Sequence, residues 1–376
     1  MENLKDKFRG CLVGGAAGDA LGYAIEFLDE KRIFSKYGKT GITEYSLDPI
    51  SGKTLISDDT QMTLFTAFAV LFAEYRFQGR GIAANPSCYA NMTCQDWLVT
   101  QEMTYEEAKK EYNYPEGYID YPDGFISVLL KDVPELYKRR APGLTCLSAL
   151  GVRRKQRKKG KQIYSFIEDK INNSKGCGGI MRVAPIGFLN YREIECIDKE
   201  GAECAAITHS HSLGYMPAAV LAHIVHRCLY NELNMTLNEI IIEARDTVAK
   251  IFAGDEHIDE LISVINDAIE LSENNATDLN NIHRLGEGWV AEETLAIAIY
   301  CSLRYQDDFS KGIIAAVNHK GDSDSTGAVT GNILGAWLGY DNIENKWKEN
   351  LEIIDTVINI ADANYSQMFL EEYDEI

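Results

Sequence analysis

The sequence predicts an all-α protein with an orthogonal multi-helix fold. Along several segments apolar residues recur every three to four positions, as on the buried face of an amphipathic helix. Alternation of apolar and polar residues, the usual mark of a strand, is nearly absent; residues 40–47 and 163–167 are the best short candidates. Five of the eight prolines fall between residues 86 and 142, so most of the chain lacks this helix breaker. Many helices and almost no strands favour a compact helical array.

The helical spacing is clearest in residues 61–76, where Leu64, Phe68 and Leu71 share one face. The same spacing predicts helices over residues 215–230, 236–253, 257–272, 291–304, 310–317 and 328–338.

Two predicted helices, one at each end of the chain, contain runs of small residues. A glycine inside a helix costs roughly 0.5–1 kcal/mol relative to alanine. Repeated glycines therefore predict helices whose backbones pack closely in a crowded centre. The small residues are Gly10, Gly14, Gly15, Ala16, Ala17 and Gly18 in the first helix, and Gly327, Ala328, Gly331, Gly335 and Ala336 in the second.

Length and composition are typical of one large globular domain. The chain has 376 residues, of which 45% are hydrophobic and 25% charged. No repeat or linker divides residues 1–376, so we expect a single domain. A Tyr- and Pro-rich stretch at 85–125 predicts an irregular insertion over about 85–170. The basic run 153–161 is expected to be a solvated loop, with a docking patch for an acidic partner as the alternative.

Charge and cysteine content restrict the partners and the compartment. With 37 basic and 57 acidic residues the net charge is −20, which argues against general nucleic-acid binding. A small anionic ligand stays possible if cations sit in its site. The nine cysteines contain no C-x-x-C pair, so reduced thiols and a cytoplasmic location are expected. No secretory signal or membrane-spanning apolar run is present, and no membrane association is expected.

Two acidic clusters, S-D-D-T at 57–60 and D-S-D-S-T at 322–326, each stand directly before a predicted helix. One such residue suffices as an N-cap, so each cluster exceeds what capping requires. Carboxylates flanked by hydroxyls are hard oxygen ligands suited to Mg²⁺ or Mn²⁺. In a compact helical fold the two clusters would face each other, which predicts a central two-metal cleft.

The D-x-D-x-T pattern at 322–326 also occurs in phosphatases of the haloacid-dehalogenase type. In those enzymes the motif should follow an apolar strand near the start of an α/β domain. Here the preceding residues have a helical pattern, and only about 50 residues follow. This alternative is therefore disfavoured.

A glycine-rich segment at 174–182 and a histidine-rich one at 208–215 complete the set of motifs. Glycines at 176, 178 and 179 would let backbone N–H groups approach a phosphate closely, and a tight inter-helix turn is the alternative. His209 would add a donor whose charge changes near neutral pH. His223 and His226, one turn apart on an apolar helix, are interpreted as core histidines.

Taken together, these motifs resemble the ADP-ribosylglycohydrolase family, which includes the dinitrogenase-reductase-activating glycohydrolase. The resemblance runs from about residue 9 to 340. The motifs that carry it, in family order, are GCLVGGAAGDALG, SDDTQMT, GCGGIMRVAP, THSHSLGY, VAEETLAIA and GDSDSTGA.

The resemblance implies a hydrolase that cleaves the glycosidic bond between ADP-ribose and a modified protein or small molecule, reversing mono-ADP-ribosylation. It also implies two Mg²⁺ or Mn²⁺ ions in a central cleft. By position, the metal ligands would be Ser57, Asp58, Asp59, Asp322, Asp324 and Ser325.

The resemblance further implies roles for residues beside the metals. Asp58, Asp59 and Glu26 would be catalytic, with Glu26 gating or handling the nucleophilic water. His209 would lie beside the distal ribose or phosphate. The substrate's diphosphate would contact the loop residues Gly176, Cys177, Gly178 and Gly179.

The sequence departs from the family pattern at a few positions. Several relatives have Asn where this chain has Cys177, and threonines of the metal motifs are serines at 57 and 325. A rival interpretation is a catalytically weak binding or immunity protein that sequesters an ADP-ribosylating toxin or an ADP-ribosyl ligand. Such a protein should lose a metal carboxylate, and all four are present; a link to a toxin or an ADP-ribosyltransferase is still expected as one kind of partner.

Overall fold

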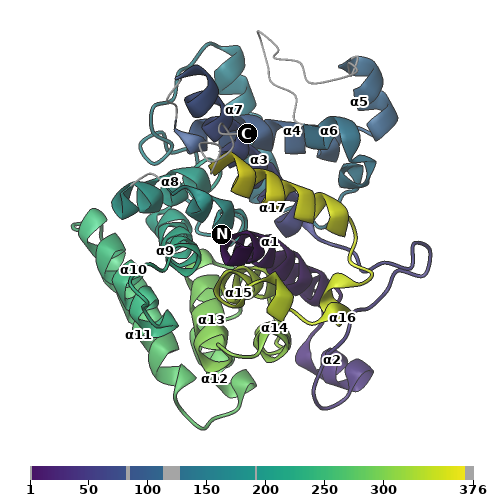
Figure 1. The fold of residues 1–376 in the computed structure, drawn as a ribbon, viewed down its shortest axis with the longest axis vertical. Helices are drawn as coiled ribbons and strands as arrows, with labels where there is room; N and C mark the ends of the chain where they lie inside the picture. The colour runs from purple at the N-terminus through teal and green to yellow at the C-terminus, as the bar shows by residue number, and fades with distance from the viewer. Residues whose placement is uncertain (1, 82–84, 113–127, 191–192, 369–376) are drawn as a thin grey trace.

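The computed structural model describes residues 2–81, 85–112, 128–190 and 193–368, and over these residues the fold is all-α (Figure 1). It contains seventeen α-helices and four short 3-10 helices within that part of the chain. β-Pairing there is limited to two isolated bridges, Thr54 with Leu351 and Gly176 with Val290. The all-α prediction is confirmed, whereas the strand candidates at 40–47 and 163–167 are wrong.

The first half of the chain forms α1 (Glu2–Tyr23), α2 (Glu30–Tyr37), α3 (Asp58–Arg80), α4 (Pro86–Glu102), α5 (Tyr105–Glu111), α6 (Val128–Asp132), η1 (Pro134–Tyr137), α7 (Leu144–Lys158), η2 (Ile180–Arg182) and η3 (Ala184–Phe188). The second half forms α8 (Ile194–Ala206), α9 (Ser212–Leu229), α10 (Leu237–Ile251), α11 (Ile258–Ser272), α12 (Asp278–Leu285), α13 (Ala291–Arg304), α14 (Phe309–Val317), α15 (Ser323–Leu338), η4 (Tyr340–Asn342), α16 (Asn345–Lys348) and α17 (Ile354–Met368). Each of the seven segments predicted from apolar spacing corresponds to one of these helices, and three of the segments extend one or two residues beyond it.

The region 85–170, which we expected to be irregular, contains α4, α5, α6 and α7. Residues 113–127 of the expected insertion lie outside the described residues. α4 begins with Pro86 at its first position, where the missing N–H has no intrahelical partner to lose. Proline here starts a helix instead of interrupting one. That the chain is a single domain stays a prediction.

The basic run 153–161 is not a solvated loop, because α7 continues through Lys158. Arg153 is buried, and its guanidinium donates to the carbonyl oxygens of Ile207 (3.0 Å) and Asp169 (3.1 Å). The same group lies over the ring of Phe166, 5.0 Å from its centroid. Arg153 is therefore part of the packed interior, whereas most later residues of the run are exposed.

Helices α1 and α15 lie side by side in the centre of the molecule (Figure 1). Glycines of the two helices face each other in pairs, and a methyl group added at any of these paired glycines would meet backbone atoms of the opposite helix inside van der Waals contact. The facing pairs are Gly10 with Gly335, Gly14 with Gly331, Gly18 with Gly327 and Gly22 with Ser323. This antiparallel order brings the C-terminal end of α1 to the N-terminal end of α15.

Helix α9 is almost fully buried, and it carries the two histidines interpreted as core residues. His223 Nδ1 lies 3.0 Å from Asp198 Oδ1, and His226 Nδ1 lies 3.2 Å from the carbonyl oxygen of Gly187. Both histidines are buried with polar partners, so the interpretation is confirmed. Among the described residues no helix is both long and apolar enough to cross a membrane.

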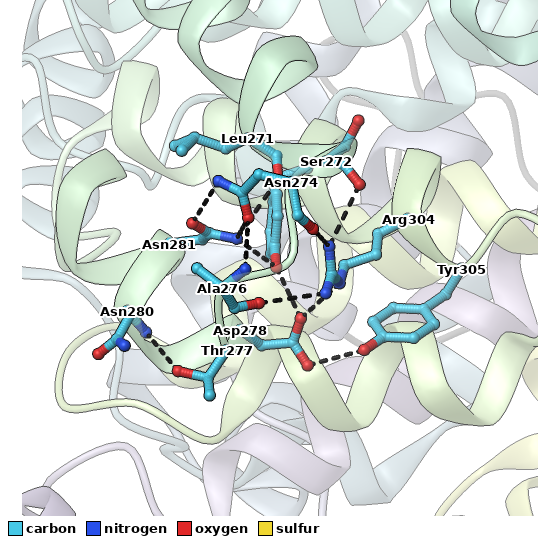
Figure 2. Close-up of polar contacts among 11 residues, drawn as sticks. Leu271, Ser272, Asn274, Ala276, Thr277, Asp278, Asn280, Asn281, Arg304 and Tyr305 are labelled. Carbon is cyan, nitrogen blue, oxygen red and sulfur yellow. Dashed lines mark hydrogen bonds and ion pairs between the residues drawn. The ribbon is translucent and has the colours of Figure 1, made fainter.

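A polar network joins α11, α12 and α13 (Figure 2). Arg304 donates to the carbonyl oxygens of Ser272 (3.3 Å) and Asn274 (2.8 Å), where α11 ends. Asp278 accepts hydrogen bonds from the hydroxyls of Tyr300 (2.6 Å) and Tyr305 (2.8 Å) and pairs with Arg304. These contacts fix the position of α13, whose N-terminal residues support the candidate site.

Candidate active site

A cleft of about 480 Å³ opens where α1, α3 and α15 converge. Ten of the twelve predicted site residues line it: Glu26, Asp58, Asp59, Gly176, Cys177, Gly178, His209, Asp322, Asp324 and Ser325. Ser57 and Gly179 do not line it. The Ser57 hydroxyl accepts a hydrogen bond from the N–H of Asp59 (3.1 Å) as the N-cap of α3, and Gly179 packs against Ala205.

Asp19 in α1 holds the first acidic cluster in place. It is completely buried, and its carboxylate accepts hydrogen bonds from the backbone N–H groups of Ser57 (3.0 Å) and Thr60 (3.1 Å) and from the Thr60 hydroxyl. The N-terminus of α3 is thereby attached to α1, which itself packs against α15. Asp19 lies in the first glycine-rich motif of the sequence, but it is not among the predicted site residues.

Five carboxylates gather in the cleft, and each of their residues is at most 8% exposed: Glu26, Asp58, Asp59, Asp322 and Asp324. One oxygen from each of Glu26, Asp322 and Asp324 lies within 4.8 Å of the others. Asp59 Oδ2 and Glu26 Oε2 are buried without a hydrogen-bond partner. Buried charges of one sign without partners are strongly unfavourable, so this donor set fits a divalent cation.

The crowding of carboxylates raises their pKa values. Burial, and after it the charge of Asp324, raises the pKa of Asp58, Asp59 and Asp322 well above the ordinary range. The same causes raise the pKa of Glu26 to about 10 and that of Asp19 to about 7. A bound cation would reverse these shifts by favouring the ionised forms.

These shifts predict how the stability of the cation-free protein depends on pH. The folded protein keeps carboxyl protons that the unfolded chain releases above about pH 4, so its free energy of unfolding falls as the pH rises. The window extends from there through the pKa of Asp19, about 7, toward that of Glu26, about 10. Urea denaturation in EDTA at about pH 5 and pH 8 measures the slope. Asp59→Asn should make it shallower; an identical slope in this variant would assign the effect to the net charge of −20 instead.

The glycine loop at 176–179 is attached to the segment that precedes α13. The N–H of Cys177 donates to the carbonyl oxygen of Trp289 (3.2 Å), and the N–H of Ala291 donates to that of Lys175 (2.9 Å). The N–H of Gly176 donates to the Ser174 hydroxyl (3.3 Å). Because the N–H groups of Gly176 and Cys177 are already bonded, an anion at this loop would need those at 178 and 179.

His209 is a neutral hydrogen-bond donor, which corrects the expectation that its charge changes near neutral pH. Burial and the nearby Arg182 lower its pKa to about 3. The Thr208 hydroxyl accepts from Arg182 Nη2 (2.7 Å) and lies 2.8 Å from His209 Nδ1. The Thr208 hydroxyl can either donate to Nδ1 or accept from it, so this contact allows both neutral tautomers of His209. In one of these tautomers the proton is on Nε2, which faces Gly176.

The site also contains apolar residues that sequence reasoning missed. Phe27, Leu144 and Trp289 line the cleft, and all three are among the exposed large hydrophobic residues of the protein. None of the described residues that line the cleft is lysine or arginine. An anionic ligand would therefore depend on backbone donors, His209 and bound cations to offset its charge.

The fold and the site together define an all-α protein with a buried acidic cleft. The family model for ADP-ribosylglycohydrolase matches residues 1–374. The chain therefore belongs to the ADP-ribosylglycohydrolase family and is an enzyme of that class. The resemblance seen in the motifs is confirmed.

Individual relatives agree with this assignment. The chain is 26% identical over 402 residues to the ADP-ribosylhydrolase ARH3 of Danio rerio, covering 99% of this chain and 93% of that protein. It is 22% identical over 362 residues to the ADP-ribosyl-[dinitrogen reductase] glycohydrolase of Rhodospirillum rubrum, covering 93% and 92%. A solved ADP-ribosylglycohydrolase-related protein complex has the same fold, with a TM-score of 0.61 at 21% identity and coverage of 98% and 100%.

Proposed function

We propose that this protein is a divalent-cation-dependent hydrolase that removes ADP-ribose from a mono-ADP-ribosylated target. The observation that carries the proposal is the group of five buried carboxylates, two of which have an oxygen without a partner. The names of the relatives support the ADP-ribosyl substrate. We further propose that the chain forms one domain and works in a reducing compartment such as the cytoplasm, since its nine cysteines are free.

The proposed cation ligands are Ser57, Asp58, Asp59, Asp322, Asp324 and Ser325, which would hold two Mg²⁺ or Mn²⁺ ions. When bound, such ions lower the pKa of a coordinated water and orient the hydroxyls of a sugar. The side chains of Glu26, Asp58 and Asp59 are the candidates to accept the proton that the attacking water loses. Hydrolysis breaks the bond from the anomeric carbon to the target, and the water oxygen takes its place.

We propose that the loop at 176–179 and His209 bind the rest of the substrate. The N–H groups of Gly178 and Gly179 would donate to the diphosphate, and Nε2–H of His209 would donate to the distal ribose or a phosphate oxygen. Because His209 is neutral, its donor role should not change between about pH 5 and 8. The expected ligand position is a groove between this loop, His209 and the carboxylates.

Adding one methyl group at Gly178 should weaken the binding of free ADP-ribose. A Cβ there would lie 2.7 Å from Cys146 Sγ and 3.0 Å from His209 Cε1. It would therefore push the N–H groups of the loop away from the His209 ring. Loss of a hydrogen bond to a charged group predicts a rise in Kd of about 10- to 100-fold. Calorimetry with ADP-ribose should compare the wild type with Gly178→Ala, in which both collisions are present. Equal affinities would mean that the loop is only a turn between helices.

The proposed activity is tested with a panel of peptides that carry ADP-ribose on arginine, serine or an acidic residue. Free ADP-ribose should appear from at least one of them when Mg²⁺ or Mn²⁺ is present. Release from none of the peptides with either cation would contradict the proposal.

A further inference from the structure

A groove of about 760 Å³ lies beside the acidic cleft, and Trp289 lines both of them. Two further segments of the chain pass from the cleft to the groove. In the first, Glu26 lines the cleft and Glu30 lines the groove. In the second, Asp322 lines the cleft and Lys320 lines the groove. Since Glu26 and Asp322 belong to the group of carboxylates whose oxygens lie within 4.8 Å of one another, the groove adjoins these carboxylates.

One wall of the groove is fixed to the loop that carries Asp322. The N–H of Asp322 donates to the carbonyl oxygen of Glu287 (2.8 Å). Glu293 Oε2 accepts from the N–H groups of Glu287 (2.9 Å) and Gly288 (3.1 Å). Glu293 belongs to the VAEETLAIA motif, to which the proposed function gives no role. These bonds hold the turn between α12 and α13, and with it the groove, at a constant place relative to the carboxylates.

The groove combines negative charge with an exposed aromatic ring. Three of its lining residues are glutamates and one is a lysine, so its formal charge is −2 when histidine is counted as neutral. Glu287 pairs with Lys320 (2.7 Å), an exposed contact of the kind that contributes little. Within the described part of the chain, Glu293 has backbone N–H partners and no ion pair. Trp289 is 42% exposed, and an indole face attracts ammonium and guanidinium groups.

We infer that this groove binds a positively charged segment of a target polypeptide, with a lysine or arginine close to the modified residue. The inference rests on the proposed function, in which the bond between ADP-ribose and the target is broken at the carboxylates. The target leaves the cleft beside that bond, and the groove is the adjoining space. A basic side chain there gains from the negative charge of the glutamates and from the ring of Trp289. Free ADP-ribose has no group beyond the bond and does not reach the groove.

The test compares two fluorescent peptides that carry ADP-ribose on the same residue and have either lysine or glutamate on both sides of it. Each pair is made with ADP-ribose on arginine, on serine and on an acidic residue. Fluorescence anisotropy measures binding to the full chain in EDTA, where no hydrolysis is expected. The lysine peptide of at least one pair should bind about fivefold more tightly or better, the ratio that one exposed charge contact can supply. This ratio should fall as salt is raised from about 0.05 to 0.5 M.

Glu287→Lys changes the formal charge of the groove from −2 to 0 and should abolish the preference for lysine peptides. Its affinity for free ADP-ribose should equal that of the wild type, which shows that the cleft is intact. Glu349→Lys is the matched control, because it makes the same change of net charge at an exposed glutamate that lines neither the groove nor the cleft. This control should keep the preference.

Equal affinities of the two peptides in every pair, or a preference that survives in Glu287→Lys, would overturn the inference. Loss of the preference in Glu349→Lys as well would assign it to the charge of the whole protein, with the same consequence. ADP-ribose release with Mg²⁺ or Mn²⁺, measured on the same wild-type preparation, separates the inference from the proposed function. Release without a preference leaves the hydrolase proposal standing. A preference that depends on Glu287, without release under either cation, supports the groove and contradicts the hydrolase proposal.

Discussion

Asp59→Asn is expected to lower ADP-ribose release by a factor on the order of 10³ or more, because loss of a metal ligand removes several kcal/mol of transition-state stabilisation. The same change should stabilise the cation-free protein. Asp59 Oδ2 has no hydrogen bond to lose, and the new amide would donate to neighbouring carboxylates instead of repelling them. Added Mn²⁺ should stabilise the variant less than the wild type, because this stabilisation comes from binding of the ion to the folded protein.

The control is Asp278→Asn, which removes a carboxylate outside the cleft lining. Asp278 accepts from two tyrosine hydroxyls and pairs with Arg304 (Figure 2), so this variant should lose stability and keep its response to Mn²⁺. Thermal unfolding with and without Mn²⁺, followed beside ADP-ribose release, distinguishes the two patterns. An Asp59→Asn protein that is less stable in EDTA and fully active would reject the proposed role of this residue.

Gly331→Leu is expected to prevent the native fold. A Cβ at Gly331 already overlaps the backbone of Gly14, and the facing glycines on either side leave no room for α1 and α15 to shift locally. Overpacking of a core typically costs about 1–3 kcal/mol and can cost more. This is a large share of a total stability of about 5–15 kcal/mol. Separation of the two helices would also move Glu26 away from Asp324, so the cluster of carboxylates in the cleft would be lost.

Gly151→Ala is the matched control for this glycine, since it lies within α7 and a Cβ there meets nothing within 4 Å. It should stabilise the protein by roughly 0.5–1 kcal/mol. Urea denaturation and circular dichroism of both variants provide the comparison. A Gly331→Leu protein with native stability would mean that α1 and α15 are not packed backbone to backbone.

Much of the fold and the acidic cleft could be predicted because their signals are local. Apolar spacing identified helices such as α3 and α9, and the glycine runs identified the two helices that meet in the centre. Each acidic cluster could be recognised because it contains more polar residues than an N-cap needs. The antiparallel contact of α1 with α15 then brings Glu26 to Asp322 and Asp324, which lie far from it in sequence.

Other features depend on tertiary contacts that no local pattern carries. Asp19 looked like one more residue in a glycine-rich helix, and only the fold shows it bonded to the N-terminus of α3. The neutral state of His209 depends on its burial and on Arg182, both of which result from the fold. Arg153 appeared in a solvated run because its carbonyl partners at 169 and 207 are distant in sequence. Leu144 and Trp289 carry no chemical signal that would mark them as cleft residues.

The most direct test of the proposed function is the release of ADP-ribose from the best peptide of the panel, measured on one preparation before and after removal of divalent cations. The proposal predicts that release stops after chelation and returns when Mg²⁺ or Mn²⁺ is added to the wild type, but does not return in Asp324→Asn. Full release by chelated protein, or restored release in Asp324→Asn, would contradict cation-dependent hydrolysis at this cleft.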